Sequence, residues 1–204
     1  MNDSNQPRKL CRRYDIVGDP HMLTFSCFKR LPLLSKDRSR KWMLDAIQLG
    51  RERELYDLWA YVIMPEHVHM VVLPRENVQI SQILALVKQS MAKRAMPWIR
   101  ENAPGFLTKL ESRSKGKSTH QFWQRGGGYD RNLRSVSDIH EKIDYIHANP
   151  VRRKLVDTPG QWPWSSYHTW ETGKDAPIPV DRDSVPMLTP VEEDVRRNIR
   201  RYEH

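Results

Sequence analysis

The feature that most constrains the fold is the apolar run from Leu55 to Leu73, which one short turn divides in two. Leu55 to Ile63 is dense in Tyr, Trp, Val and Ile, the residues typical of strands. Met64-Pro65-Glu66 reads as the turn, and His67 to Leu73 reads as a second strand. We therefore predict a β-hairpin, which needs further elements to bury its apolar side chains.

The rest of the chain supplies those elements. Residues 21–28 and 122–133 predict strands, the second interrupted by three glycines that we expect to form a bulge or turn. Residues 35–53, 81–96 and 135–149 predict helices, because apolar residues recur on one face of each. The order of strands and helices implies an α+β fold, an antiparallel sheet with helices packed against it.

Two segments depart from this pattern. Residues 99–121 contain a Ser-rich basic stretch, for which we predict a loop that is disordered until it meets a partner. After Trp170 the chain becomes acidic and proline-rich, and we expect a tail with one short terminal helix. The domain boundaries expected are therefore residues 14–170 for the folded domain and residues 171–204 for the tail.

The charge distribution points to a polyanionic partner. The 204 residues carry a net charge of +9; residues 171–194 carry −5 and residues 195–204 carry +3, which leaves +11 on residues 1–170. A basic body of this kind suits nucleic acid, although a basic solvated surface is the alternative. Two cysteines, Cys11 and Cys27, exclude a disulfide scaffold and a four-cysteine zinc site, and we interpret both as structural. No signal peptide or apolar membrane span is evident, so we expect a cytoplasmic protein.

His67 and His69 are the first candidate functional pair. Side chains alternate along a strand, so both imidazoles lie on one face, with Cα atoms roughly 7 Å apart. Two imidazoles on one face can share a divalent metal ion. The alternative is two unrelated strand histidines.

Tyr145 and Asn149 are the second pair. They are four residues apart in the predicted helix, which we expect to end at Asn149 because Pro150 disfavours a helical residue before it. A tyrosine can act as a covalent nucleophile, and an amide oxygen is a hard metal ligand. Placed against the histidine face, this helix would complete a three-ligand metal site with a phenol alongside. Read alone, Tyr145 is a surface aromatic and Asn149 a helix end.

Four motifs in register resemble the REP-associated tyrosine transposases, which belong to the HUH single-tyrosine nucleases. They are Tyr61-Val-Ile-Met-Pro-Glu-His-Val-His-Met70, Phe122-Trp-Gln-Arg-Gly-Gly-Gly-Tyr-Asp-Arg131, Tyr145-Ile-His-Ala-Asn-Pro-Val-Arg152 and Trp162-Pro-Trp-Ser-Ser166. The resemblance implies a ferredoxin-like sheet, His67, His69 and Asn149 as ligands of Mg²⁺ or Mn²⁺, and Tyr145 as nucleophile. Glu66 departs from the family, which usually has Asn before the first His.

The resemblance also implies a function. It predicts a metal-dependent endonuclease and strand transferase acting on single-stranded hairpin DNA of repetitive extragenic palindromes through a 5′-phosphotyrosine, with no nucleotide cofactor, as a monomer or homodimer. The alternative is a regulator that binds the hairpin and no longer cuts.

Basic and aromatic residues along the chain are candidates for the DNA contacts. Trp123, Tyr129 and Trp164 can stack on bases, and we expect at most one of them to do so. Phosphate contacts are predicted for Lys88, Lys93, Arg94, Arg125, Arg131, Arg134, Arg152 and Arg153.

Overall fold

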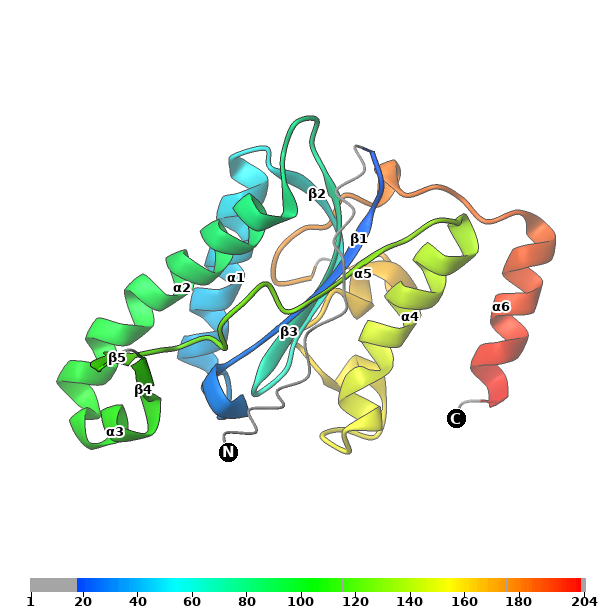
Figure 1. Ribbon diagram of the computed structural model, residues 1–204. Coiled ribbons are helices and arrows are strands. Elements are labelled where there is room, and N and C mark those ends of the chain that lie inside the picture. Colours follow the sequence, from blue (N-terminus) through cyan, green and yellow to red (C-terminus); the bar gives the residue numbers. More distant parts are fainter. Residues whose placement is uncertain (1–17, 115, 175, 203–204) are drawn as a thin grey trace, which may run out of the picture.

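The computed structural model describes residues 18–202 except 115 and 175, so Cys11 and the start of the predicted domain lie outside the described residues. Its centre is a four-stranded sheet in the order β2-β3-β1-β6 (Figure 1). The strands are β1 (His21–Ser26), β2 (Tyr56–Ile63), β3 (His67–Pro74) and β6 (Tyr129–Asn132), and every neighbouring pair is antiparallel. The predicted hairpin is therefore the β2–β3 pair.

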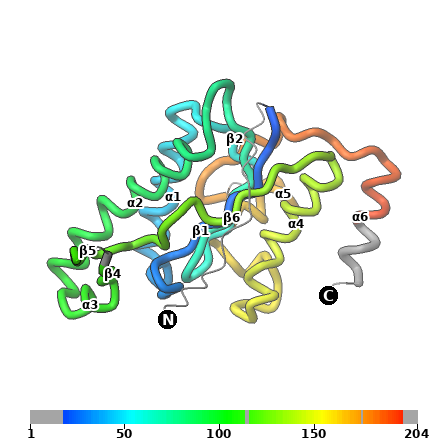
Figure 2. Tube along the Cα trace, viewed as in Figure 1, coloured from blue at the N-terminus to red at the C-terminus, as the bar shows by residue number. Residues whose placement is uncertain are grey.

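Two helical crossovers connect the strands. Helix α1 (Asp37–Glu52) links β1 to β2, and α2 (Ile80–Asn102) follows β3 and precedes the short elements that lead to β6. Figure 2 shows β6 running beside β1 at the edge of the sheet. This order and connectivity are those of a ferredoxin-like sheet, so the predicted α+β fold is confirmed.

Both faces of the sheet are covered. Val68, Met70 and Val72 of β3 pack with α1 and α2 in the larger apolar core. Val71, with Trp59 and Val62 of β2, packs with Ile139, Ile143 and Ile146 of α4 (Val136–Arg152) in a second core. His67 and His69 alternate with the first set along β3 and so face α4.

Helix α4 begins after Ser135, one of the two N-cap positions (Ser135 or Ser137) that the sequence predicts, and it ends later than predicted. The Ser135 hydroxyl accepts a hydrogen bond from the Asp138 backbone N–H, so Ser135 is the N-cap. The expected end at Asn149 is wrong, because Pro150 lies inside the helix, which continues to Arg152. Asn149 and Pro150 are both buried. We attribute the continuation to this burial, which outweighs the local preference of a residue before proline.

The basic segment that we expected to be a disordered loop is largely ordered. After α2 come a 3-10 turn (Pro104–Phe106), α3 (Leu107–Leu110) and a hairpin of β4 (Glu111–Ser114) and β5 (Lys117–His120). The Glu111 carboxylate accepts a hydrogen bond from Ser118 across this hairpin and another from Arg113 on its own strand. Buried Leu110 and Phe122 anchor its two ends. Composition alone indicated disorder, whereas these anchors and cross-strand pairs stabilise the hairpin.

The predicted strand at residues 122–124 is reduced to one bridge between Trp123 and Cys27. Cys27 is buried, in agreement with a structural role. Gly126 and Gly128 have positive φ, as expected of a turn.

The segment after Trp170, which we expected to be a tail, packs against β2. It includes the end of α5 (Tyr167–Thr172), a 3-10 turn (Arg182–Ser184) and the predicted terminal helix α6 (Pro190–Tyr202). Ile178 enters the larger core, and Asp181 accepts hydrogen bonds from the Leu58 backbone N–H and from Arg51. Arg196 of α6 donates two hydrogen bonds to Asp144 of α4.

Among the helices of the described residues, none combines the length and apolar character that a membrane crossing demands.

Candidate active site

The Nε2 atoms of the two histidines of β3 lie close together. The Nε2 atoms of His67 and His69 are 2.9 Å apart, with the two rings nearly perpendicular (88°). Both side chains are buried, at 6% and 5% exposure. Their position follows from strand alternation, which places both on the face that α4 covers.

The Nδ1 atom of each histidine lies beside a side-chain oxygen. His69 Nδ1 lies 2.7 Å from Thr24 Oγ1, and His67 Nδ1 lies 3.2 Å from Glu66 Oε1. Burial lowers the pKa of His67, against the opposing effect of the Glu66 carboxylate. Burial, with the neighbouring His67, lowers the pKa of His69 to about 3. Both imidazoles are therefore neutral at pH 7, the form that binds metal.

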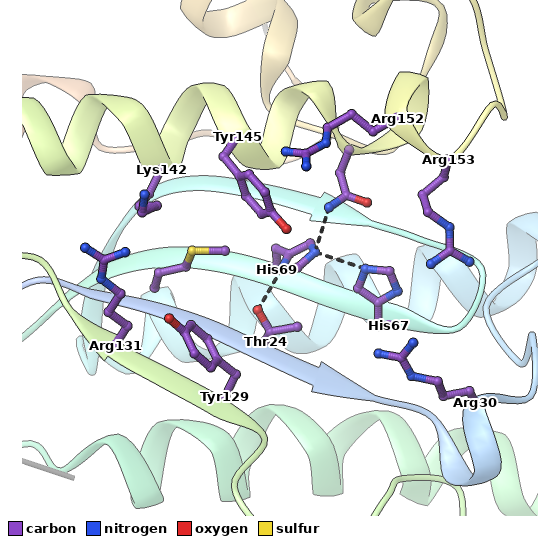
Figure 3. Close-up of a pocket in the computed structure, with 12 residues that line it drawn as sticks. Thr24, Arg30, His67, His69, Tyr129, Arg131, Lys142, Tyr145, Arg152 and Arg153 are labelled. Carbon is purple, nitrogen blue, oxygen red and sulfur yellow. Dashed lines mark hydrogen bonds between the residues drawn. The ribbon is translucent and has the colours of Figure 1, made fainter. Parts of the chain in front are cut away.

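Helix α4 places Tyr145 beside the two histidines (Figure 3), and it also carries Asn149. The Asn149 side-chain nitrogen is 3.1 Å from His69 Nε2. The Tyr145 ring meets the His69 ring edge-on, with centroids 6.1 Å apart, and is 37% exposed. The Arg152 guanidinium lies 4.8 Å from the centroid of the Tyr145 ring. The structure thus brings together all four residues that the sequence predicted for catalysis and metal binding.

This donor set fits a divalent metal ion. Two imidazole nitrogens that bind one ion at about 2.1 Å each lie about 3.0–3.4 Å apart, close to the separation of the two Nε2 atoms. Turning the Asn149 amide would present its oxygen in place of its nitrogen. Within the part of the chain that the structure describes, no three His, Cys, Asp or Glu side chains could hold a metal ion together. The Asn149 amide is a further donor group that the structure places beside the histidine pair.

The site lies in a cavity of about 610 Å³ whose wall is rich in cations. Tyr129 of β6 stands across the cavity from Tyr145 and is 47% exposed (Figure 3). The cationic lining residues are Arg30, Arg131, Lys142, Arg152 and Arg153. A cavity with this lining attracts a polyanion and can hold phosphates on several sides.

The predicted phosphate-contacting residues divide into two groups. Arg131, Arg152 and Arg153 line the cavity. Lys88 and Arg125 line a separate groove of about 440 Å³ along α2, where Lys88 donates to the carbonyls of Gln124 and Gly126. Lys93, Arg94 and Arg134 line neither; all three are exposed, and Arg94 pairs with Asp45.

The aromatic candidates are also separated. Trp123 is buried, and its indole N–H donates to the Lys88 backbone carbonyl. Trp164 is partly buried and packs against both apolar cores. Tyr129 is the member of the three that lines the cavity.

Sequence reasoning missed four cavity residues, the apolar Met22 and the polar Thr24, Arg30 and Lys142. Lys142 lies three residues before Tyr145, so helical spacing could have found it. Thr24 is the register partner of His69, which depends on the pairing of β1 with β3. Arg30 follows β1 in a left-handed backbone conformation (φ 54°) that no local motif indicated.

The antiparallel ferredoxin-like sheet, the paired His-x-His and the tyrosine on the facing helix are the features that the sequence resemblance predicted. A search of protein-family models finds none that matches the chain. The chain is 25% identical over 158 residues to the REP-associated tyrosine transposase of Escherichia coli, a match that covers 77% of this chain and 81% of that protein. It is 24% identical over 143 residues to a Haemophilus influenzae protein that carries the same name provisionally, covering 67% and 77% of the two chains.

A solved structure gives the same fold. A REP-associated tyrosine transposase bound to a REP hairpin superposes with a TM-score of 0.62 at 21% identity, covering 88% of this chain and 97% of that one. The comparisons confirm the resemblance on which the sequence-based identification rests. The chain is similar to proteins named REP-associated tyrosine transposase, and the enzyme class predicted from its sequence, a tyrosine transposase, is the one that their names give.

Proposed function

We propose that the chain is a metal-dependent endonuclease and strand transferase that acts on single-stranded hairpin DNA, with Tyr145 as nucleophile. The observation that carries the proposal is the position of the Tyr145 phenol beside the His67–His69 pair in a cation-lined cavity. His67, His69 and Asn149 are the proposed ligands of Mg²⁺ or Mn²⁺. Such an ion supplies positive charge that polarises the scissile phosphate and offsets the charge that develops on it.

Tyr145 performs the bond exchange. Its phenol oxygen, on losing its proton, attacks the phosphorus of a phosphodiester and forms a new P–O bond. The bond from phosphorus to the 3′ oxygen breaks, and that oxygen takes up one proton from solvent, balancing the proton that the phenol lost, and leaves as a free 3′-OH. The 5′ phosphate stays on Tyr145, so the reverse reaction joins it to another 3′-OH without ATP.

Arg152 and Lys142 flank the nucleophile. The Arg152 guanidinium stacks over the Tyr145 ring, and Lys142 lies one turn before it on α4. Two cations at this position offset the negative charge of the attacking oxygen and of the phosphate that it approaches. Each thereby favours the transition state over the neutral phenol.

The substrate class follows from the cavity and from the relatives. The cavity is open enough for Tyr129 and Tyr145 to reach a strand, and its cations match a phosphate backbone. The solved relative is bound to a REP hairpin, and we propose a hairpin of the same type here. The proposed DNA contacts are Lys88, Lys93, Arg94, Arg125, Arg131, Arg134, Arg152 and Arg153, with Arg30 and Lys142 added from the cavity lining.

Three further points belong to the proposal. The nucleophile and the ligands come from one chain, which supports activity of a single protomer. Sedimentation of the protein decides between a monomer and a homodimer.

Residues 14–170 are the proposed catalytic domain, with residues 171–204 as the segment that follows it. The cytoplasmic location stays a prediction.

The test is denaturing gel electrophoresis of a hairpin oligonucleotide with protein and Mn²⁺. An oligonucleotide labelled at its 3′ end should give a labelled protein band, whereas a 5′ label should leave with the released fragment. Tyr145→Phe should give neither product while still retarding the hairpin on native gels. Retardation of the hairpin by the wild-type protein without any adduct would favour the alternative, a binding regulator.

A further inference from the structure

We propose that Glu66 is a positioning residue that fixes the tautomer of His67 and the guanidinium of Arg153 through one carboxylate. The inference rests on the proposed function, because it concerns the histidine to which that function assigns a metal. Glu66 ends the turn between β2 and β3, at the position where the family resemblance predicts asparagine.

The carboxylate is buried and has two partners. Glu66 is 8% exposed, and its Oε1 lies 3.2 Å from His67 Nδ1 and 2.8 Å from Arg153 Nη2. The turn that carries it is fixed by backbone hydrogen bonds. Cys27 N–H donates to the Glu66 carbonyl and Met64 N–H donates to the His67 carbonyl, each at 2.8 Å. Glu66 therefore has little freedom to leave these partners.

This contact determines which nitrogen of His67 carries the hydrogen. An ionised carboxylate only accepts hydrogen bonds, so the Nδ1 that faces Glu66 must be the N–H. The lone pair of His67 then lies on Nε2, which points toward His69 and the cavity (Figure 3). A histidine held in this way is prepared to bind a cation before the cation arrives.

His69 is held differently. Its Nδ1 faces the Thr24 hydroxyl, which can donate or accept a hydrogen bond. Since Nε2 of His67 has no hydrogen, the hydrogen in the 2.9 Å contact between the two Nε2 atoms belongs to His69. His69 must therefore move its hydrogen to Nδ1 when a cation binds, and rotation of the Thr24 hydroxyl allows this. Glu66 makes His67 the fixed member of the pair.

The same carboxylate orients Arg153. The Arg153 side chain is half-exposed at the cavity rim, where a free guanidinium would sample many positions. A neutral amide in place of Glu66 could still accept from His67, but it would lack the charge that retains Arg153. Glutamate at this position thus connects the metal-binding pair to a cation of the cavity rim.

The direct test is nitrogen-15 NMR of the histidine rings in the metal-free protein. We expect wild-type His67 in the Nδ1–H form, and a mixture of both forms in Glu66→Ala. Calorimetric titration with Mn²⁺ should show about 10–100-fold weaker binding by Glu66→Ala, the range typical of removing the outer partner of a metal-binding histidine.

Matched variants isolate the contact of Glu66 with His67 from its contact with Arg153. Glu66→Gln keeps an acceptor, so it should restore the Nδ1–H form and most of the Mn²⁺ affinity. Arg153→Ala removes the second partner and should leave the His67 tautomer unchanged. Glu101→Ala removes an exposed carboxylate of α2 and should change neither measurement. Where Glu66→Ala does not fold, Glu66→Met offers similar volume without an acceptor.

The outcomes distinguish this inference from the proposed function. An unchanged His67 tautomer in Glu66→Ala or Glu66→Met overturns the inference, even if the wild type binds Mn²⁺ and cleaves DNA. Absence of Mn²⁺ binding by the wild type contradicts the proposed function, and the tautomer measurement still decides the role of Glu66.

Discussion

At the residue scale, Gly128 shows how the absence of a side chain allows the chain before β6 to approach β1 closely. Its φ is +77°, and a Cβ there would lie 2.0 Å from the Thr24 carbonyl oxygen. Gly128→Ala should therefore strain the backbone and push β6 away from β1, next to the threonine that contacts His69. We expect the free energy of unfolding in urea to fall by about 1–3 kcal/mol.

Gly105→Ala is the matched control for this prediction. Nothing lies within 4 Å of a Cβ built at Gly105, so its effect should stay within about 0.5 kcal/mol. Equal unfolding free energies for the two variants would contradict the close approach at Gly128.

The three proposed ligands should contribute unequally to metal binding. His67→Ala and His69→Ala should each weaken Mn²⁺ binding by more than about 100-fold, because each removes a buried imidazole donor. Asn149→Ala should weaken Mn²⁺ binding by about 10-fold, since a neutral amide oxygen is a weaker donor. Calorimetry on the three variants is the check, and wild-type affinity in the double histidine variant would place the metal elsewhere.

At the element scale, the segment around Asp181 fastens the chain after α5 to strand β2. Burial alone would raise the pKa of the Asp181 carboxyl, but hydrogen bonds from Arg51 and the Leu58 N–H hold it below the ordinary value of 3.8. Asp181→Asn keeps an acceptor for Leu58 and removes the ion pair with Arg51. We expect it to lower the unfolding free energy by about 1–2 kcal/mol at pH 7.

The pH dependence of this difference has a defined sign. A carboxyl with a depressed pKa in the folded state stabilises above its unfolded pKa, and the contribution disappears as the pH falls through the folded value. The difference between wild type and Asp181→Asn should therefore shrink as the pH falls from the unfolded pKa through the folded one. A difference that grows with acidity would rule out the ion pair as its source.

The hairpin of β4 and β5 presents cations on an exposed surface, and we expect it to help grip DNA. The four basic residues in and beside it are Lys109, Arg113, Lys115 and Lys117, of which Lys115 lies outside the described residues. Replacing all four residues with Ser should weaken the binding of hairpin DNA at low salt. It should also flatten the slope of log affinity against log salt, by about 0.7 for each phosphate that the variant no longer neutralises. The preference of the protein for one DNA hairpin over another should barely change. An unchanged slope would mean that the β4–β5 hairpin is a solvated surface that does not contact DNA.

Elements were predictable where the signal is local and strong. The alternation of β3 indicated correctly that His67 and His69 share one face, and two serines, Ser135 and Ser137, limited the start of α4 to within two residues. The end of α4 was not predictable, because Pro150 stays helical through burial that only the tertiary fold supplies. The β4–β5 hairpin was missed for a similar reason: its polar composition resembles a loop, and its anchors Leu110 and Phe122 lie outside it.

At the scale of the whole molecule, the site joins four stretches of chain that are distant in the sequence. His67, His69, Tyr145 and Asn149 could be proposed from two short motifs, since each pair has a spacing that fixes its relative position. The two pairs meet only because α4 packs over β3. The order of the motifs along the chain implied this packing, but no single motif required it. Thr24 and Arg30 could not be found in this way, because strand pairing and a left-handed backbone bring them to the cavity.

The central claim is that Tyr145 forms a covalent bond to DNA at the His67–His69 pair. The most direct measurement is mass spectrometry of peptides from wild-type protein trapped on a hairpin oligonucleotide with Mn²⁺. We predict the mass of the 3′ fragment, through its 5′ phosphate, on the peptide that contains Tyr145. Nucleotide mass on the peptide that contains Tyr129, or adduct formation by Tyr145→Phe, would contradict the account.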